Sequence, residues 1–378
     1  MFAIKYLKTS LFCLLSLVPM LASCGGEPDI QAANTEQSYQ AVLYYQDDDI
    51  PWGMDWLPDG SMLVSFRSGT VKLIRNGQLV VDNIKGLPEI AVGGQGGLLD
   101  VKVHPDYANQ GWIYFSYARE DKRGNKSTAV MRAKLKGDSL VEQQDIYLAQ
   151  AYDDAGRHFG SRLAFDRQGY LYFSIGDRAN RDVNPQDISR DGGKIYRLHD
   201  DGRIPKDNPF INEPKAKTAI YSYGHRNPQG MALHPKTGKV WIHEHGPRGG
   251  DEVNLIAPGK NYGWPLVSHG VNYSGTKFTE LTEKEGMESP LWHWTPSIAP
   301  SGMTFVTSDN YPQWQNHLLV GSLKFGYLVM LTLADNRVIA QEKLFEGLIR
   351  VRNVKQGSDG FLYVGVDGKG IYRIEKRP

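Results

Sequence analysis

Cysteine is almost absent from this 378-residue sequence, which contains only Cys13 and Cys24. Two cysteines are too few for a zinc ribbon or for a small scaffold held together by several disulfides. An excess of charge of one sign is also lacking, because 43 Lys and Arg residues oppose 42 Asp and Glu residues. A formal net charge of +1 gives no electrostatic footprint for nucleic acid, so we expect partners to be recognised by a local site.

Long hydrophobic runs are also missing, except for one near the N-terminus. Lys5 and Lys8 precede an apolar run from Leu11 to Met20, which is too short to span a bilayer but typical of a signal peptide. The run ends in Leu21-Ala22-Ser23-Cys24, which resembles a bacterial lipobox. We therefore predict a lipoprotein signal peptide over residues 1–23 and a lipid on Cys24. A simple signal peptide followed by an incidental cysteine is the alternative.

The residues after Cys24 predict where the protein is held. Acyl chains on a single cysteine anchor a protein stably, so contact with the membrane is expected through the lipid alone. Gly25 follows the cysteine, and this resembles lipoproteins sent to the outer membrane of Gram-negative bacteria. The expected location is the periplasmic face of that membrane. Residues 24–40 are polar and are predicted to form a lipidated tether, followed by a folded domain over residues 41–378.

The rest of the chain repeats one pattern, a Gly- or Asn-containing turn followed by a short aromatic or β-branched run. The six runs are Ser61–Ser65, Trp112–Ser116, Tyr170–Ser174, Lys239–His243, His317–Gly321 and Phe361–Gly365. Further short strands flank most of them, and helical periodicity is almost absent. This pattern predicts an all-β protein, a six-bladed β-propeller with a functional face formed by long loops. Val42-Leu43-Tyr44 is predicted to pair with Gly370–Glu375 and close the ring; two separate domains are the less favoured alternative.

Two loops carry residues that strand packing does not require. In Gly93-Gly94-Gln95-Gly96-Gly97, the glycines allow the backbone to approach a flat ligand and leave Gln95 as the only side chain, although a flexible loop is the alternative. His158 precedes one strand, and Asp177 follows the next. Such a pair can be catalytic, because the carboxylate fixes the imidazole tautomer and raises its basicity. A turn or surface role for His158 is the alternative.

Two polar runs lie before and after the fourth predicted strand. The first contains Arg226 and Asn227, and the second extends from Glu244 through Gly246-Pro247 to Glu252. Gly-Pro turns with nearby carboxylates can offer carbonyl and carboxylate oxygens to calcium, a hard cation. EF-hand spacing is absent, so a plain loop remains the alternative, and zinc is disfavoured because paired His spacing and mature thiols are lacking.

A third set is cationic and lies late in the chain. Lys324 follows a predicted strand, and the alternation in Arg350-Val351-Arg352 places both guanidinium groups on one face of a strand. Two cations so close repel each other unless an anion lies between them. This predicts an anionic ligand, with a solvated edge as the alternative. Tyr273 lies near these loops and can wall a flat ligand or belong to the core.

Taken together and in order, these motifs resemble those of the soluble PQQ-dependent aldose sugar dehydrogenases, which belong to the glucose/sorbosone dehydrogenase family. The resemblance covers nearly all of the chain after Tyr44. It implies a six-bladed propeller that binds pyrroloquinoline quinone (PQQ) and calcium on its loop face. The tricarboxylate cofactor would account for the cationic set.

The resemblance also implies individual roles. His158 takes the position of the general base that accepts the proton of the sugar C1 hydroxyl as hydride moves to the quinone, and Asp177 takes that of the carboxylate orienting it. Arg226 is expected to stabilise charge on the quinone. The implied cofactor contacts are Gln95, His158, Arg226, Asn227, Tyr273, Lys324, Arg350 and Arg352. The implied calcium ligands are the carbonyls of Gly246 and Pro247, with Glu252 and Tyr262 at a calcium site in closer relatives.

The predicted function is therefore PQQ- and calcium-dependent oxidation of the C1 hydroxyl of aldoses to lactones, with electrons passed to an external acceptor. The chain lacks the longer insertions of glucose dehydrogenases, which leaves the sugar open. A homodimer is compatible with the resemblance, but no residue here decides it. The alternatives are a calcium-dependent propeller lactonase and a propeller that binds sugars or proteins without catalysis.

Overall fold

Six four-stranded sheets make up the computed structural model, which describes Met1 and residues 35–378. The predicted signal peptide, Cys24 and the tether up to residue 34 lie outside the described residues. Among the residues described, no helix combines the length and the apolar character needed to cross a membrane. The helical elements are short, namely η1 (Thr35–Ser38), α1 (Tyr107–Gln110) and η2 (Pro312–Trp314).

The first three sheets, or blades, follow chain order from the innermost strand outward. Blade 1 contains β2 (Pro51–Trp56), β3 (Met62–Phe66), β4 (Thr70–Arg75) and β5 (Gln78–Val81). Blade 2 contains β6 (Leu98–Val103), β7 (Trp112–Glu120), β8 (Lys126–Lys136) and β9 (Ser139–Leu148). Blade 3 contains β10 (Leu163–Phe165), β11 (Leu171–Ile175), β12 (Lys194–Leu198) and β13 (Ile220–Tyr223).

The next two blades repeat this order, and the last takes its outer strand from the N-terminus. Blade 4 contains β14 (Pro228–Leu233), β15 (Val240–Glu244), β16 (Asp251–Leu255) and β17 (Trp292–Trp294). Blade 5 contains β18 (Pro300–Phe305), β19 (Leu318–Ser322), β20 (Leu328–Ala334) and β21 (Arg337–Leu344). Blade 6 contains β22 (Val351–Gln356), β23 (Leu362–Val366), β24 (Gly370–Lys376) and β1 (Tyr39–Tyr45).

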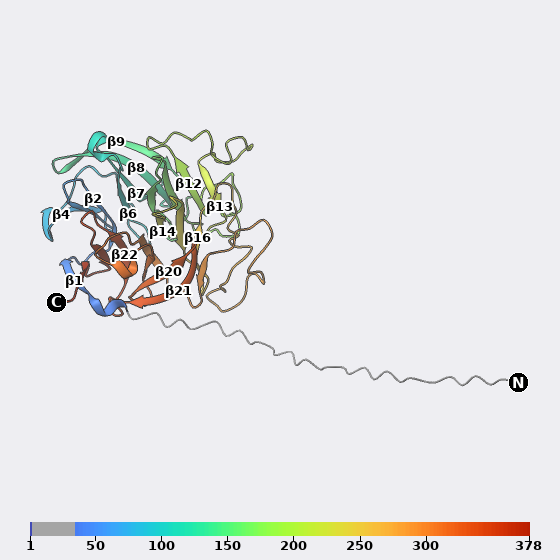
Figure 1. Cartoon of the computed structure of the whole chain (residues 1–378). Helices are drawn as coiled ribbons and strands as arrows, with labels where there is room; N and C mark the ends of the chain where they lie inside the picture. Colours follow the sequence, from blue (N-terminus) through green and yellow to red (C-terminus); the bar gives the residue numbers. More distant parts are fainter. Residues whose placement is uncertain (2–34) are drawn as a thin grey trace. The chain divides into compact units, whose positions relative to one another are not determined.

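The blades form a closed ring. The innermost strands β2, β6, β10, β14, β18 and β22 contact their neighbours in turn, and β22 contacts β2. Figure 1 shows the same path, in which the sequence colours run round the ring and return β22 to the side of β1 and β2. Strand β1 pairs with β24, with Val42 opposite Arg373, which confirms the predicted closure. The six-bladed propeller is confirmed, and β1 begins at Tyr39, two residues before the predicted start of the domain.

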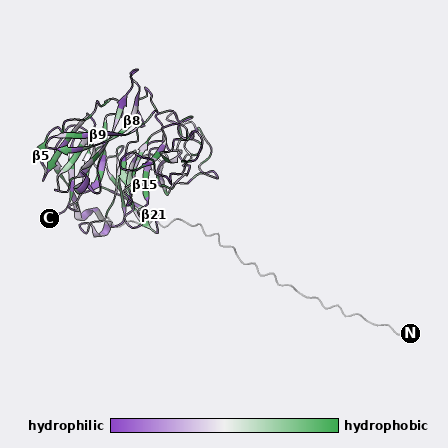
Figure 2. Ribbon diagram, turned by 90° about the horizontal axis from the view of Figure 1, so that it is seen from above, coloured by the Kyte–Doolittle hydropathy of each residue, from purple (hydrophilic) through white to green (hydrophobic). Residues whose placement is uncertain are grey.

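Hydrophobic packing lies between the blades. Six larger clusters of buried residues each occupy one junction of neighbouring blades, such as Met54, Val64 and Ile371 between blades 1 and 6. The second strands β3, β11, β19 and β23 are buried at every position, because a blade neighbours them on both faces. Figure 2 shows the hydrophobic colouring along the labelled strand β15, another second strand that is buried at every position. Burial on both faces explains why these strands read as apolar runs.

All six predicted second strands are present, and each begins within one residue of its predicted start. The main difference lies in blade 4. The segment Glu244–Glu252 was predicted to be a loop, but Glu244 ends β15 while Asp251 and Glu252 begin β16. Its sequence Asp-Glu-Val-Asn-Leu carries too many polar residues to read as a strand on its own. Pairing with β15 and β17 supplies the missing stabilisation.

Candidate active site

The predicted functional residues gather at one end of the ring. Because every blade has four strands that run alternately up and down, all six innermost strands begin at the same end. His158, Arg226 and Arg350 precede innermost strands, whereas Asp177 and Lys324 follow second strands. Residues that are far apart in the sequence therefore share one face.

His158 and Asp177 form a hydrogen-bonded pair. Nδ1 of His158 lies 2.7 Å from Oδ1 of Asp177, and both side chains are buried. The second oxygen, Oδ2, accepts a hydrogen bond from the indole Nε1 of Trp264 at 2.8 Å, a partner that the sequence did not predict. Since the carboxylate accepts the Nδ1 proton, Nε2 of the imidazole is the free base. No protein partner for this Nε2 occurs among the described residues.

The backbone around His158 is held in an uncommon conformation. His158 has a φ of 57°, in the left-handed region that a β-carbon disfavours. Its backbone N–H donates to the side-chain oxygen of Gln95 at 2.8 Å, and the N–H of Gly160 donates to Oδ1 of Asn227 at 3.0 Å. The guanidinium of Arg178 lies 3.6 Å above the ring centre of Phe159. These contacts fix the direction in which the imidazole points.

Burial and a neighbouring cation keep His158 neutral. Burial lowers the pKa of His158, the positive charge of Arg226 lowers it further, and the Asp177 carboxylate only partly opposes both. Burial raises the pKa of Asp177, but hydrogen bonds from His158 and Trp264 and the charge of Arg226 hold it below its usual value. A neutral imidazole beside an ionised carboxylate is the protonation state that a general base needs.

Arg226 lies beside this pair, and its guanidinium is only partly satisfied. Nη1 donates to the carbonyl oxygen of Gly246 at 2.8 Å and to that of His245 at 3.2 Å. Its Nε is buried and has no hydrogen-bond acceptor among the described residues. A buried N–H of a cation without an acceptor is costly, so this atom indicates that a ligand oxygen belongs here.

Three adjoining cavities surround these groups and share Gln95. The first, of about 450 Å³, is lined by His158, Asp177, Arg226, Pro247 and Tyr273. The second, of about 1200 Å³, shares Pro247 and Tyr273 with the first and adds Lys324 and Arg350. The third, of about 270 Å³, contains Arg350 and Arg352. Tyr273 is 74% exposed, so it borders the open space and does not belong to the core. Asn227 lines none of the three cavities and is buried.

The predicted cationic set does converge, although the anion between its two arginines belongs to the protein. Asp367 accepts hydrogen bonds from Nε of Arg350 at 3.1 Å and from Nε and Nη2 of Arg352 at 3.0 Å each. Arg350 lies just before β22, so the shared face of one strand is not what brings the two together. Sequence alone gave no signal for Asp367. The side chain of Arg350 is 54% exposed, and Lys324 is also exposed, so both can bind a further anion.

The four predicted calcium ligands lie in two places. Pro247 borders the first two cavities, and the carbonyl of the adjacent Gly246 is bound by Arg226. Glu252 instead lies near Glu244 on the neighbouring strand, and Asn254 donates to both carboxylates at 3.2 and 3.3 Å. Tyr262 stacks on His225 with ring centres 4.6 Å apart, and His225 bonds Glu244 at 2.8 Å.

This carboxylate pair has the chemistry of a cation site. Burial and the charge of Glu244 raise the pKa of Glu252 to about 8. The oxygen Oδ1 of Asn254 is buried without a donor among the described residues. Within the described part of the chain, no three His, Cys, Asp or Glu side chains are grouped to hold a metal. Any ion here therefore also needs amide or backbone oxygens, which suit a hard cation. Glu244 directly follows the predicted strand Lys239–His243, whereas in the structure it is the last residue of β15 and pairs in register with Glu252.

Comparison with known proteins places this arrangement in a family. Residues 48–373 match the family model described as Glucose / Sorbosone dehydrogenase. The chain belongs to this family. A relative, the aldose sugar dehydrogenase YliI of Escherichia coli K12, is 41% identical over 325 residues, which cover 84% of this chain and 87% of the relative.

Solved structures agree with this glucose/sorbosone dehydrogenase assignment. The soluble aldose sugar dehydrogenase from Escherichia coli in its apo form matches with a TM-score of 0.85 and 37% identity, over 90% of this chain and 100% of that one. The PQQ-bound aldose sugar dehydrogenase from Streptomyces coelicolor matches with a TM-score of 0.71 and 26% identity, over 90% of this chain and 98% of that one.

Proposed function

We propose that this member of the glucose/sorbosone dehydrogenase family oxidises the C1 hydroxyl of aldose sugars to lactones, using PQQ and calcium. The observation that carries the proposal is the neutral His158, held by Asp177 and facing a cavity beside a partly unsatisfied Arg226. The sugar dehydrogenase relatives and the PQQ-bound neighbour support the same chemistry.

The residues present fit a planar, triply anionic cofactor. Nε of Arg226 lacks an acceptor among the described residues, and Lys324 and Arg350 line the adjoining large cavity. Arginine suits carboxylates because its planar fork binds two oxygens at once. Gln95 lies at the junction of all three cavities, where a flat ligand that spans them would touch it. Bound PQQ would supply a two-electron acceptor for the hydride that leaves C1.

The chain's own residues supply the proton chemistry. Nε2 of His158 accepts the C1 hydroxyl proton as the C1–H bond breaks and the C1=O bond of the lactone forms. Asp177 then stabilises the imidazolium through the 2.7 Å hydrogen bond. Arg226 donates to oxygen on which negative charge develops. Arg157, Asp182 and Asn272 line the first cavity and provide polar groups for sugar hydroxyls. The protein has no second store of electrons among these groups, so an external acceptor completes the cycle.

Calcium is proposed to bind in the carboxylate cluster beneath the cavity. Glu252 and the free oxygen of Asn254 offer oxygens, and Glu244 supplies the second negative charge. The Tyr262 hydroxyl already donates to the carbonyl of Leu255 and accepts the N–H of Ala257, so Tyr262 would contribute its backbone oxygen. Glu244 also accepts the backbone N–H of Arg226. The ion would therefore stiffen the segment that carries Arg226. The carbonyls of Gly246 and Pro247 remain a second proposed position at the cavity itself.

Dye reduction tests the proposed function. The protein, purified with detergent and loaded with PQQ and calcium chloride, should reduce an artificial electron acceptor when glucose, xylose or maltose is added. Activity should require PQQ and should form the lactone, detected by hydroxamate assay. A folded protein that binds PQQ yet reduces no dye with any aldose would refute the proposal. Lactone hydrolysis without PQQ would instead favour the lactonase alternative.

Replacing Arg350 with alanine should weaken cofactor binding. Arg350 lines the large cavity with a half-exposed guanidinium, and its loss removes one charge-assisted contact to a carboxylate. Such a contact contributes about 1.5–3 kcal/mol, so the PQQ concentration needed for half-maximal activity should rise about 10- to 100-fold. Arg337→Ala, which removes an exposed arginine on β21, is the matched control. An unchanged PQQ requirement in Arg350→Ala would contradict the assignment.

The location of the protein is proposed to be the periplasmic side of the outer membrane, held through a lipid on Cys24. Replacing Cys24 with serine should abolish incorporation of radiolabelled palmitate and move the protein from the detergent phase to the aqueous phase of Triton X-114, because acyl chains provide the anchor. Cys13→Ser should change neither the palmitate incorporation nor the partition into the detergent phase. Labelling that persists in Cys24→Ser would contradict the predicted lipid attachment.

A further inference from the structure

A separate cavity lies in the central channel, toward the end opposite to His158. It has a volume of about 230 Å³ and is lined by Leu163–Phe165 of β10, Met231–Leu233 of β14 and Met303–Phe305 of β18, among others. Strand β22 connects the two ends, because Arg352 lines the third active-site cavity and Lys355 lines this one. Three residues of strand separate them by roughly 10 Å. None of the proposed cofactor or calcium ligands lines this cavity.

Charged groups around this cavity come from four of the six blades, namely blades 1, 2, 3 and 6. Strand β2 contributes Asp55, and β6 contributes Asp100 and Lys102. Arg162 precedes β10, and Lys355 lies on β22. Strands β14 and β18 carry no ionisable side chain. Three cations thus face two carboxylates, which leaves an excess of one positive charge if all five are ionised.

Both carboxylates are already fully engaged. Asp55 accepts from Lys102 at 2.9 Å, from Lys355 at 3.2 Å and from the backbone N–H of Val103 at 2.8 Å. Burial raises the pKa of Asp55, but Lys102 and Lys355 outweigh this and hold it at about 2. Asp100 accepts from Nη1 of Arg162 at 3.0 Å and from the N–H of Leu163 at 2.9 Å. Neither carboxylate is free to neutralise the third cation.

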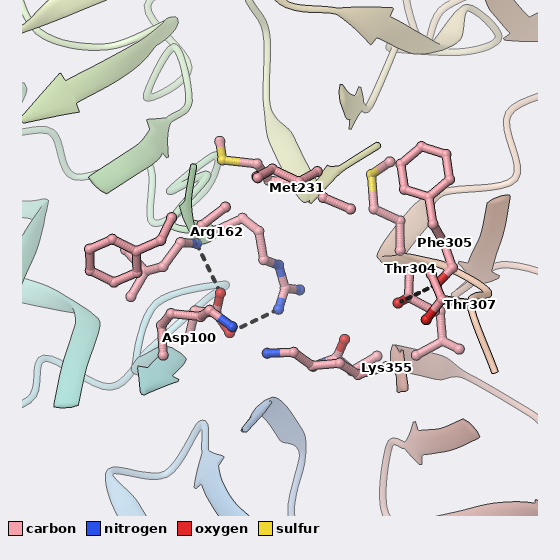
Figure 3. A pocket seen from close by; sticks show the side chains of 16 residues that line it. Asp100, Arg162, Met231, Thr304, Phe305, Thr307 and Lys355 are labelled. Carbon is pink, nitrogen blue, oxygen red and sulfur yellow. Dashed lines mark hydrogen bonds and ion pairs between the residues drawn. The ribbon is translucent and has the colours of Figure 1, made fainter. Parts of the chain in front are cut away.

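The cations, by contrast, have donors to spare. Arg162 uses Nε on the carbonyl of Gln229 and Nη1 on Asp100, and its Nη2 has no acceptor among the described residues. Lys355 donates to Met54 O and to Asp55, and its ammonium group also lies within hydrogen-bonding reach of Lys102. In Figure 3 the ammonium of Lys355 and the guanidinium of Arg162 point into the same space. Thr304 and Thr307 lie across the cavity from them.

This arrangement is costly without a further negative charge. Burial lowers the pKa of Lys355 to about 8, and the charge of Lys102 lowers it further against the opposing pull of Asp55. The Arg162 side chain is only 7% exposed, and its guanidinium stacks 4.2 Å from the ring centre of Trp52. Water can accept hydrogen bonds here and solvate part of the charge, whereas an anion would neutralise it.

We propose that the cavity binds a small inorganic anion, a halide or an oxyanion such as phosphate, between Lys355 and Arg162. The volume far exceeds the roughly 10–15 Å³ that one water needs, so an oxyanion also fits. The anion would link blade 6 to blade 3 across the channel, beside Lys102 of blade 2. It would therefore contribute to holding the ring together.

Halide binding tests this proposal. Chloride exchanging with a protein site broadens the ³⁵Cl NMR line of sodium chloride, and the wild-type protein should produce more broadening than Lys355→Met. Lys206→Met removes an exposed lysine and should match the wild type. Sodium phosphate added at constant ionic strength should abolish the difference if an oxyanion also occupies the site, whereas a difference that persists assigns the site to halide alone.

Crystallography of the wild-type protein locates the anion directly. This test does not depend on whether Lys355→Met folds. Wild-type crystals soaked in sodium bromide should show an anomalous difference peak between Lys355 and Arg162. Lys102→Met keeps both of these groups and should weaken the peak by removing one of the three cations. A wild-type map without a peak at this position, or equal ³⁵Cl broadening by the wild type and a folded Lys355→Met, would overturn the proposal.

Discussion

Replacing His158 with alanine should lower kcat for aldose oxidation by about 10²- to 10⁴-fold, the range that positioned general bases contribute. The imidazole is the one base that lines the first cavity in neutral form, with Nδ1 committed to Asp177 and Nε2 free. PQQ should still bind, because Arg226, Lys324 and Arg350 are untouched. Stopped-flow reduction of the loaded enzyme measures the loss of the chemical step, and a PQQ titration followed by absorbance checks binding. His199→Ala, in a turn far from the cavities, is the matched control.

The pH dependence of kcat/KM tests the role of His158 independently. Burial and Arg226 place the pKa of His158 below its ordinary value of 6.5, so the imidazole is already neutral at pH 7. We expect kcat/KM to stay level as the pH falls from 7 to 6.5. It should decline only below pH 6.5, as Nε2 of His158 becomes protonated. A decline that begins above pH 7 would contradict the described surroundings of His158. Equal kcat in His158→Ala and the wild type would remove it from the mechanism.

Removal of calcium should produce the largest change in stability. A ligand that binds only the folded state stabilises it by about 3–4 kcal/mol at concentrations roughly 100 to 1,000 times its Kd. Chelation with EGTA should therefore lower the Tm of the wild type, and added calcium should restore it. Glu252→Gln should make the Tm insensitive to both, because it removes the carboxylate whose pKa burial and Glu244 raise to about 8.

The control for this experiment is Glu285→Gln, which neutralises an exposed carboxylate and should respond to EGTA like the wild type. Calorimetry at fixed pH measures each Tm. If Glu252→Gln loses stability on chelation as the wild type does, calcium binds elsewhere, and the carbonyls of Gly246 and Pro247 become the candidates. Magnesium at the same concentration should restore less of the lost Tm than calcium does, because Mg²⁺ demands a stricter octahedral geometry.

The repeat was readable from sequence because it is local. A turn followed by a short apolar run recurs six times, and each second strand is buried on both faces by neighbouring blades. Blade 4 shows the limit of this reading. Strand β16 is polar and owes its conformation to pairing with β15 and β17, which no window of its own sequence contains.

In the candidate site, the sequence likewise predicted some residues but not their partners. The residue types at the strand ends identified His158, Asp177, Arg226 and Lys324, because such groups are not needed for packing. Their partners were not readable. Trp264 bonds Asp177 from 87 positions away, and the carbonyl oxygen of the Gln95 side chain holds a backbone N–H 63 positions away. Ring closure, and not sequence spacing, sets these distances.

The sequence by itself determined the number of blades, the strand that closes the ring and the loops that carry the chemistry, since each depends on residues near one another in the chain. Only the tertiary structure decided which charges meet. It placed Asp367 between Arg350 and Arg352, put Glu252 beside Glu244, and gathered three cationic side chains around two carboxylates near Lys355. A nearly neutral composition could not reveal these local imbalances, because Coulomb energy depends on distance and burial, and both arise only when the six blades pack around one channel.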